Sequence, residues 1–140
     1  MELTRRKMLA IGSGTLAIAA LPGLPAFASA TDDAIAAFTG GADLVEGGVT
    51  INAPEIAENG NTVPIDVSAP GAVSIALFAA GNPVPNVATF TFGPLAASQS
   101  AATRIRLAGT QDVIAVAQMA DGSFAKASAN VKVTIGGCGG

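Results

Sequence analysis

The chain contains no tryptophan, tyrosine or histidine, and it has a single cysteine among its 140 residues. Without histidine it lacks the commonest general base and the commonest metal ligand, which excludes most hydrolase triads and zinc sites. Six phenylalanines are its only aromatic residues, although half of the chain is apolar. A chain of this length and composition holds one domain with a modest core, and catalysis by the chain alone is not expected.

Basic residues are also scarce once the first thirty residues are set aside. From Thr31 onward four lysines and arginines stand against nine acids, a net charge of −5. Because phosphate binding needs clustered Lys and Arg, we expect no nucleic-acid partner. The acids are dispersed, and the Gly-rich stretch 40–48 lacks the alternating oxygen ligands of a calcium loop, so no metal site is predicted.

Residues 1–30 have the features of an export signal: a basic start, an uncharged run rich in Ala, Gly and Leu, and an Ala-Ser-Ala ending. The pair Arg5-Arg6 follows a threonine and precedes Lys-Met-Leu, which fits the twin-arginine pattern. We expect export by that route, cleavage after Ala28 or Ala30, and a mature protein of about 110 residues in an oxidising compartment, with no membrane attachment. An uncleaved membrane anchor over 8–30 is the alternative.

The mature chain is predicted to begin with a short helix and to continue in strands. Residues 31–41 carry two early acids, apolar Ile35 and Phe38 three positions apart, and a Gly-Gly stop, which favours a helix. Runs of apolar and β-branched residues between turn signals then predict about seven strands. The expected strands are 49–52, 62–68, 73–79, 87–92, 102–108, 113–120 and 124–135. An all-β, immunoglobulin-like antiparallel sandwich follows from this pattern.

Three local patterns refine this expectation. Asp121-Gly122 predicts a hairpin turn before the last strand, in which a break near Asn130 is left open. Strand 102–108 alternates two arginines with two apolar residues, which is typical of a half-solvated strand. Strand 113–120 is apolar on both faces, so it needs the core on one side and a loop, a helix or another chain on the other.

The single cysteine, Cys138, lies two residues from the C-terminus between Gly136-Gly137 and Gly139-Gly140. Glycines offer no side chain for packing and wide backbone freedom, so this segment is predicted to be a flexible arm. A lone cysteine in an exported protein is free, pairs with another chain, or carries a covalent group. From the residues alone a carrier thiol, an inter-chain disulfide and an incidental tail cysteine all stay open.

The expected arm is short and its thiol is weakly activated. At about 3.3–3.6 Å per residue, the Cys138 α-carbon lies about 10 Å beyond Ile135. No histidine exists to activate the thiol, and the nearest basic residue, Lys132, is separated from it by much of a strand. Only a small thiolate fraction is expected at neutral pH, so activation must come from the active site of a partner.

Four stretches of the chain closely resemble the SoxY family, the sulfur carriers of the periplasmic thiosulfate-oxidising Sox system. They are VKVTIGGCGG at the C-terminus, PEIAENGNTVP at 54–64, NPVPNVATFTFGP at 82–94 and TRIRLAGTQDVIAVAQMADGSF at 103–124. The resemblance implies an immunoglobulin-like fold and covalent attachment of sulfur at Cys138. It also implies a heterodimer with SoxZ, which lacks an export signal and would contribute to covering strand 113–120.

The same resemblance implies a reaction cycle in which this chain is a carrier and not an enzyme. The SoxAX cytochrome joins thiosulfate to the thiol, SoxB releases sulfate, and SoxCD, where present, oxidises the remaining sulfur. No cofactor is expected beyond the cysteine-bound adducts. The expected organisation is a signal over 1–30, a carrier domain over 31–135 and an arm over 136–140. The alternative function is an exported structural module cross-linked through Cys138.

Overall fold

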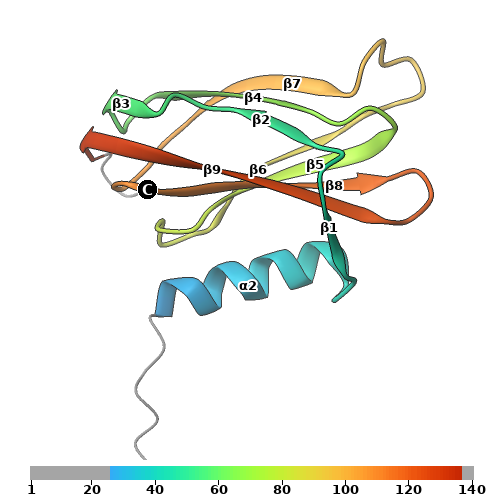
Figure 1. Ribbon diagram of the computed structural model, residues 1–140, viewed down its shortest axis with the longest axis horizontal. Helices are drawn as coiled ribbons and strands as arrows, with labels where there is room; N and C mark the ends of the chain where they lie inside the picture. Colours follow the sequence, from blue (N-terminus) through green and yellow to red (C-terminus); the bar gives the residue numbers. More distant parts are fainter. Residues whose placement is uncertain (1–25, 137–140) are drawn as a thin grey trace, which may run out of the picture.

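The computed structural model describes residues 26–136, which form a helix packed on a sandwich of two sheets (Figure 1). The elements are α2 (Ala26–Thr39), β1 (Leu44–Glu46), β2 (Thr50–Asn52), β3 (Ile56–Asn59), β4 (Val63–Ser68), β5 (Ala72–Ala79), β6 (Asn86–Thr91), β7 (Ser100–Ile105), β8 (Gln111–Met119) and β9 (Phe124–Ile135). The larger sheet has the order β1-β9-β8-β5-β6, with β3 also paired to β9, and the smaller sheet has the order β2-β4-β7. The helix lies against the outer face of the larger sheet (Figure 1).

The immunoglobulin-like sandwich predicted from the sequence is confirmed, and the seven expected strands appear as β2 and β4–β9. Strand β9 is continuous through Asn130. Two short strands, β1 and β3, were not predicted, and both pair in parallel with β9. The helix begins at Ala26 and not at residue 31, so the two acids expected in its first turn lie further along it.

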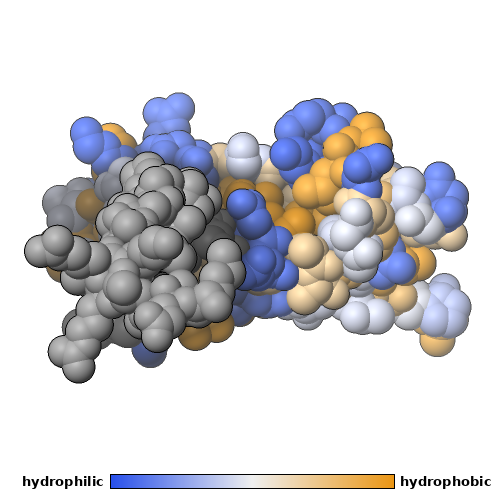
Figure 2. All heavy atoms as spheres, turned by 90° about the horizontal axis from the view of Figure 1, so that it is seen from below, coloured by the Kyte–Doolittle hydropathy of each residue, from blue (hydrophilic) through white to orange (hydrophobic). Residues whose placement is uncertain are grey.

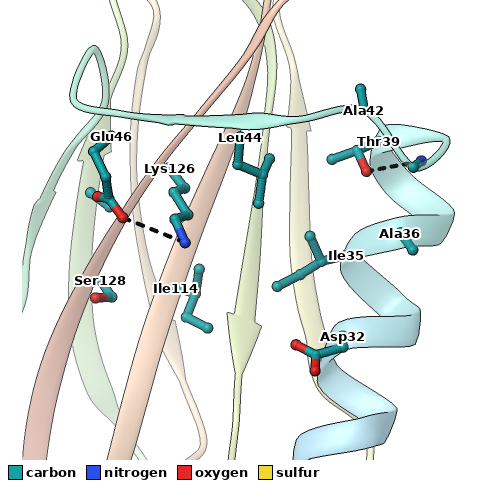
Figure 3. A pocket seen from close by; sticks show the side chains of 12 residues that line it. Asp32, Ile35, Ala36, Thr39, Ala42, Leu44, Glu46, Ile114, Lys126 and Ser128 are labelled. Carbon is teal, nitrogen blue, oxygen red and sulfur yellow. Dashed lines mark hydrogen bonds and ion pairs between the residues drawn. The ribbon is translucent and has the colours of Figure 1, made fainter.

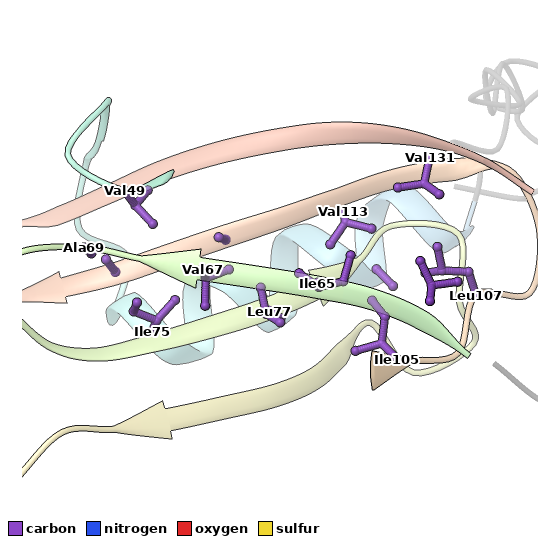
Figure 4. Packing of buried hydrophobic residues seen from close by; sticks show 14 of the residues in the cluster. Val49, Ile65, Val67, Ala69, Ile75, Leu77, Ile105, Leu107, Val113 and Val131 are labelled. Carbon is purple, nitrogen blue, oxygen red and sulfur yellow. The ribbon is translucent and has the colours of Figure 1, made fainter. Parts of the chain in front are cut away.

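The core between the two sheets is built from alternating side chains. In β4, Val63, Ile65 and Val67 are buried while Pro64 and Asp66 are exposed, so one face of this strand packs and the other meets water. Apolar side chains of β5, β8 and β9 meet this face from the opposite sheet (Figure 4). The labelled members of the cluster are Val49, Ile65, Val67, Ala69, Ile75, Leu77, Ile105, Leu107, Val113 and Val131.

Helix α2 covers the second apolar face of β8. Val116 on this face is fully buried, in a cluster with Phe78 and Phe124 against which Ile35 and Phe38 of the helix pack. The Phe38 ring lies 6.3 Å from the ring of Phe78 and 5.9 Å from that of Phe124, both edge to face. Of the covers expected for this face, which were a loop, a helix or another chain, the structure shows the chain's own helix, and the contribution expected from SoxZ stays a prediction.

The predicted hairpin turn at Asp121-Gly122 is confirmed between β8 and β9. Gly122 has a φ of 87°, a left-handed conformation that favours glycine. The Oδ1 atom of Asp121 accepts hydrogen bonds from the hydroxyl of Ser123 at 2.6 Å and from its backbone N–H at 2.9 Å. These two bonds, the hydroxyl first, favour the carboxylate and lower the pKa of Asp121.

Replacement of Phe38 by alanine tests the role of the helix. Phe38 is half-buried, so Phe38→Ala should lower the free energy of unfolding by about 2–3 kcal/mol, somewhat less than a fully buried phenylalanine. Denaturant unfolding measures the change. Leu95→Ala, at a side chain that is 98% exposed, is the control and should change stability by less than about 0.5 kcal/mol. Equal stabilities of the two variants would contradict the packing of α2 on the sheet.

The turn gives a prediction for pH dependence. Because Ser123 lowers the pKa of Asp121, Ser123→Ala should raise that pKa toward the ordinary value for aspartate. The stabilisation by this turn is present above the unfolded-state pKa and is lost as pH falls through the folded-state pKa. An NMR titration of the Asp121 carboxyl carbon measures the change, and an unaltered titration midpoint in the variant would refute the assignment.

Candidate functional site

The predicted site residues fall mostly at the two ends of the chain. Cys138, Gly137, Gly139 and Gly140, like Arg5 and Arg6, lie outside the described residues. Gly136 is described and exposed at the end of β9. The structure therefore defines the base from which the predicted arm leaves the domain, which is the end of β9 with its neighbouring strand and loop (Figure 1).

Strand β9 ends at Ile135, as the sequence predicted, and it is held there by the segment that contains β3. The backbone carbonyl of Ile135 accepts a hydrogen bond from the N–H of Gly60 at 2.7 Å, and the N–H of Lys132 donates to the carbonyl of Glu55 at 2.9 Å. The side chain of Ile135 is nevertheless 66% exposed. The end of the strand is therefore held by backbone hydrogen bonds and not by the side chain of Ile135.

The loop that connects β7 to β8 forms the other side of this base. Its Leu107 is fully buried, and the N–H of Leu107 donates to the carbonyl of Gly60 at 2.8 Å. At the end of the loop the hydroxyl of Thr110 accepts a bond from the N–H of Val133 at 2.9 Å and donates one to the carbonyl of Val133 at 3.4 Å. Gly60 thus bonds both to the loop and to the last residue of β9.

A buried asparagine, to which the sequence analysis gave no role, holds this loop. Asn82 is fully buried, and its Nδ2 donates to the carbonyl of Arg106 at 2.8 Å. Its Oδ1 accepts from the N–H of Ala108 at 3.0 Å and from Nε2 of Gln111 at 2.9 Å. Gln111 also donates to the carbonyl of Gly109 at 3.0 Å. These partners lie 24–29 residues after Asn82 in the sequence, so no local sequence pattern predicts these hydrogen bonds.

Gly136 lies directly against this loop. A Cβ atom built on Gly136 would overlap the carbonyl oxygen of Ala108 and lie 3.3 Å from its carbonyl carbon. A glycine is therefore required here for lack of space. The φ of Gly136 lies outside the left-handed region, so backbone conformation alone does not demand glycine.

Charges around the base are sparse. Lys132 and Glu58 are exposed on β9 and β3, and the ion pair that the structure records within residues 26–136 is elsewhere, between Lys126 and Glu46 at 3.4 Å. In the same residues no group of three or more His, Cys, Asp or Glu side chains could hold a metal ion. No helix of the described part is long and apolar enough to cross a membrane.

A groove of about 360 Å³ lies between α2 and the larger sheet (Figure 3). Ile35, Leu44 and Ile114 supply apolar walls, and the Lys126–Glu46 pair crosses one side. Figure 2 shows apolar and polar side chains interspersed where this side of the molecule is visible. The β9 residues of the groove, 126–128, are near the start of the strand. The groove and the base of the arm are thus not brought together.

Known proteins similar to this chain show the same fold. The family described as "Sulfur oxidation protein SoxY" matches residues 35–138. The solved structure of the sulfur carrier protein SoxY from Chlorobium limicola f thiosulfatophilum is 41% identical, covers 77% of this chain and 99% of its own, and has a TM-score of 0.67. No curated protein matches the chain.

More distant structures support the fold alone. A superoxide reductase (neelaredoxin) from Ignicoccus hospitalis is 19% identical, covers 62% of this chain and 80% of its own, and has a TM-score of 0.54. A putative superoxide reductase from Thermotoga maritima is 19% identical, covers 69% of this chain and 89% of its own, and has a TM-score of 0.51. Given the family match over residues 35–138 and the 41% identity to a solved member, this chain belongs to the SoxY family of sulfur-carrier proteins.

Proposed function

We propose that Cys138 is the covalent attachment point for sulfur intermediates of thiosulfate oxidation. The observation that carries the proposal is the SoxY family match, which extends to Cys138 itself. The end of β9 at Ile135 supports it, because the thiol then follows three residues beyond the last strand. A thiol so close to the domain can be presented to the active site of an enzyme that contacts this end of the sandwich.

The proposed loading step balances with an electron acceptor. The Cys138 thiolate and thiosulfate form a sulfur–sulfur bond to give Cys138–S–S–SO₃⁻, and two electrons pass to the SoxAX cytochrome. SoxB then adds water to the terminal sulfonate, which leaves as hydrogen sulfate, and the cysteine retains a persulfide. SoxCD, where present, converts the outer persulfide sulfur to a sulfonate with three water-derived oxygens, and six electrons pass to its electron acceptor. A second hydrolysis then releases hydrogen sulfate and frees the Cys138 thiol.

The chain itself contributes a substrate handle and no catalysis to this cycle. It has no histidine to act as a base, so proton removal from the thiol falls to the partner enzyme. No cofactor is required beyond the cysteine-bound group. This division of labour suits a carrier whose intermediate must survive passage between several enzymes, because an unactivated thiol adduct is less prone to react on the way.

The working form of the carrier is proposed to be a periplasmic heterodimer with SoxZ. Arg5 and Arg6 fit a twin-arginine signal, and that route carries folded cargo, which would allow SoxZ to cross with this chain. Because α2 already buries Val116 on the outer face of β8, SoxZ is not needed to cover that residue. The alternative role, a structural module cross-linked through Cys138, would instead give a stable disulfide dimer.

Intact-mass measurement tests the attachment site. The reduced protein, incubated with thiosulfate and the cognate cytochrome, should gain one thiosulfate-derived group, and Cys138→Ser should gain none. A relocated thiol is the matched control: Gly93→Cys in the Cys138→Ser background, at an exposed turn with open space, should load little or not at all. An unmodified wild-type chain, or a disulfide dimer inert to thiosulfate, would refute the carrier function.

Deletion of residues 137–140 tests whether the arm and the SoxZ interface are separate. The truncated chain keeps Gly136 and every strand of the described fold, so it should bind SoxZ with unchanged affinity and lose loading entirely. Titration calorimetry with SoxZ measures the first result and the intact-mass assay the second. A truncated chain that no longer binds SoxZ would place the arm in the interface and contradict this prediction.

A further inference from the structure

We infer that Gly136 is a positioning residue: it seats the start of the arm against the backbone of the β7–β8 loop and thereby sets the point from which Cys138 is presented. The inference rests on the carrier role of Cys138 proposed above. It gives Gly136 a role of its own among the four glycines around Cys138, which the sequence pattern alone does not distinguish. Its ground is the contact between Gly136 and Ala108.

The contact leaves no room for a side chain on Gly136. A Cβ atom there would overlap the carbonyl oxygen of Ala108 and come within 4.0 Å of the N–H nitrogen of Gly109. A collision with a backbone carbonyl is not relieved by a rotamer change, so either the loop or the end of β9 would have to move. Gly109, in the loop next to Ala108, differs from Gly136 in this respect, because a Cβ atom built on it would have no other atom within 4 Å.

Both sides of the contact are fixed. The N–H of Ala108 is bonded at 3.0 Å to the fully buried side chain of Asn82. On the other side, the carbonyl of Ile135, one residue before Gly136, is bonded to Gly60 at 2.7 Å. Gly60 also accepts the bond from Leu107 at 2.8 Å, next to Ala108. Displacing the loop would break bonds of a buried amide, so displacement of the arm is the easier response to a side chain at Gly136.

A fixed Gly136 shortens the reach of the thiol. Two extended residues, at about 3.3–3.6 Å each, separate Gly136 from Cys138, which gives a reach of about 7 Å from the seat. Because one glycine separates Gly136 from Cys138, the arm has little length over which to compensate for a shift of its origin, and we expect part of that shift to reach the sulfur atom. Reactions in enzyme sites are sensitive to such shifts, and a misplacement of 1 Å can cost about 100-fold in rate.

Gly136→Ala tests the seat. Loading by thiosulfate and the cognate cytochrome should slow by about tenfold or more, because the thiol is presented off position. Gly137→Ala adds the same methyl group to the arm but leaves the contact of Gly136 with Ala108 in place, so it should slow loading less. Gly109→Ala, which adds a Cβ into open space on the loop, should load at the wild-type rate. Alkylation of Cys138 by iodoacetamide should proceed at the same rate in all four proteins, since a small reagent needs no docking.

Equal loading of the Gly136→Ala and Gly137→Ala variants would overturn the inference. Backbone ¹⁵N relaxation gives an independent measurement on the wild-type protein: Gly136 should show an order parameter near about 0.85, like the strands, and a value below about 0.6 would also overturn it. Because relaxation needs no enzyme, it tests the seat even if wild-type protein fails to load. Failure to load at all, with a rigid Gly136, would refute the carrier function and leave the seat in place.

Discussion

The end of the sandwich that bears the arm depends on satisfying the buried amide of Asn82. Burying a polar group without hydrogen-bond partners lowers the stability of the fold by roughly 1–3 kcal/mol. The side chain of Asn82 is fully buried, so it needs hydrogen-bond donors and acceptors around it. Its partners are the backbone of the β7–β8 loop and the side chain of Gln111. The loop therefore has little freedom to adopt another path, and Leu107 and Ala108 are held where they meet Gly60 and Gly136.

Strand β9, from which the arm continues, is held by pairing with other strands along its length. It pairs with β8 along one edge, and along the other with β1 near its start and β3 near its end. Near its start β9 is paired on both edges, and near its end β3 pairs with one edge while the hydroxyl of Thr110 bonds to Val133 on the other. Backbone groups that are bonded in this way resist fraying. Its last residue can consequently be exposed at the side chain and still be fixed at the backbone, as Ile135 is.

Local patterns predicted most of the strands but could not predict what pairs with them. The β-branched run that forms β4 and the Asp121-Gly122 turn are properties of neighbouring residues, and the strand and the turn were both predicted correctly. The strands β1 and β3 have three and four residues with mostly exposed side chains, so no hydrophobic period marks them. They exist because β9 offers them an edge, which is a relation between distant segments.

The candidate site shows the same division. Its cysteine and glycines are conspicuous in the sequence, and the family resemblance that they carry is shown by the match over 35–138. The glycines look alike there because each lacks a side chain. The contact that sets Gly136 apart involves Ala108, 28 residues earlier in the chain, and only the folded structure brings the two together.

The proposed seat at Gly136 is two residues from Cys138 in the sequence, and this has a kinetic consequence for the proposed carrier. Once an enzyme docks at the end of β9, the thiol is delivered from a tether, and its effective concentration in the active site is roughly millimolar or higher whatever the abundance of the protein. Free oxidants and thiols in the compartment meet the same weakly reactive group only at bulk concentration. A short arm also selects among enzymes, because it can deliver its sulfur group only to an active site that lies near the surface of the docked enzyme.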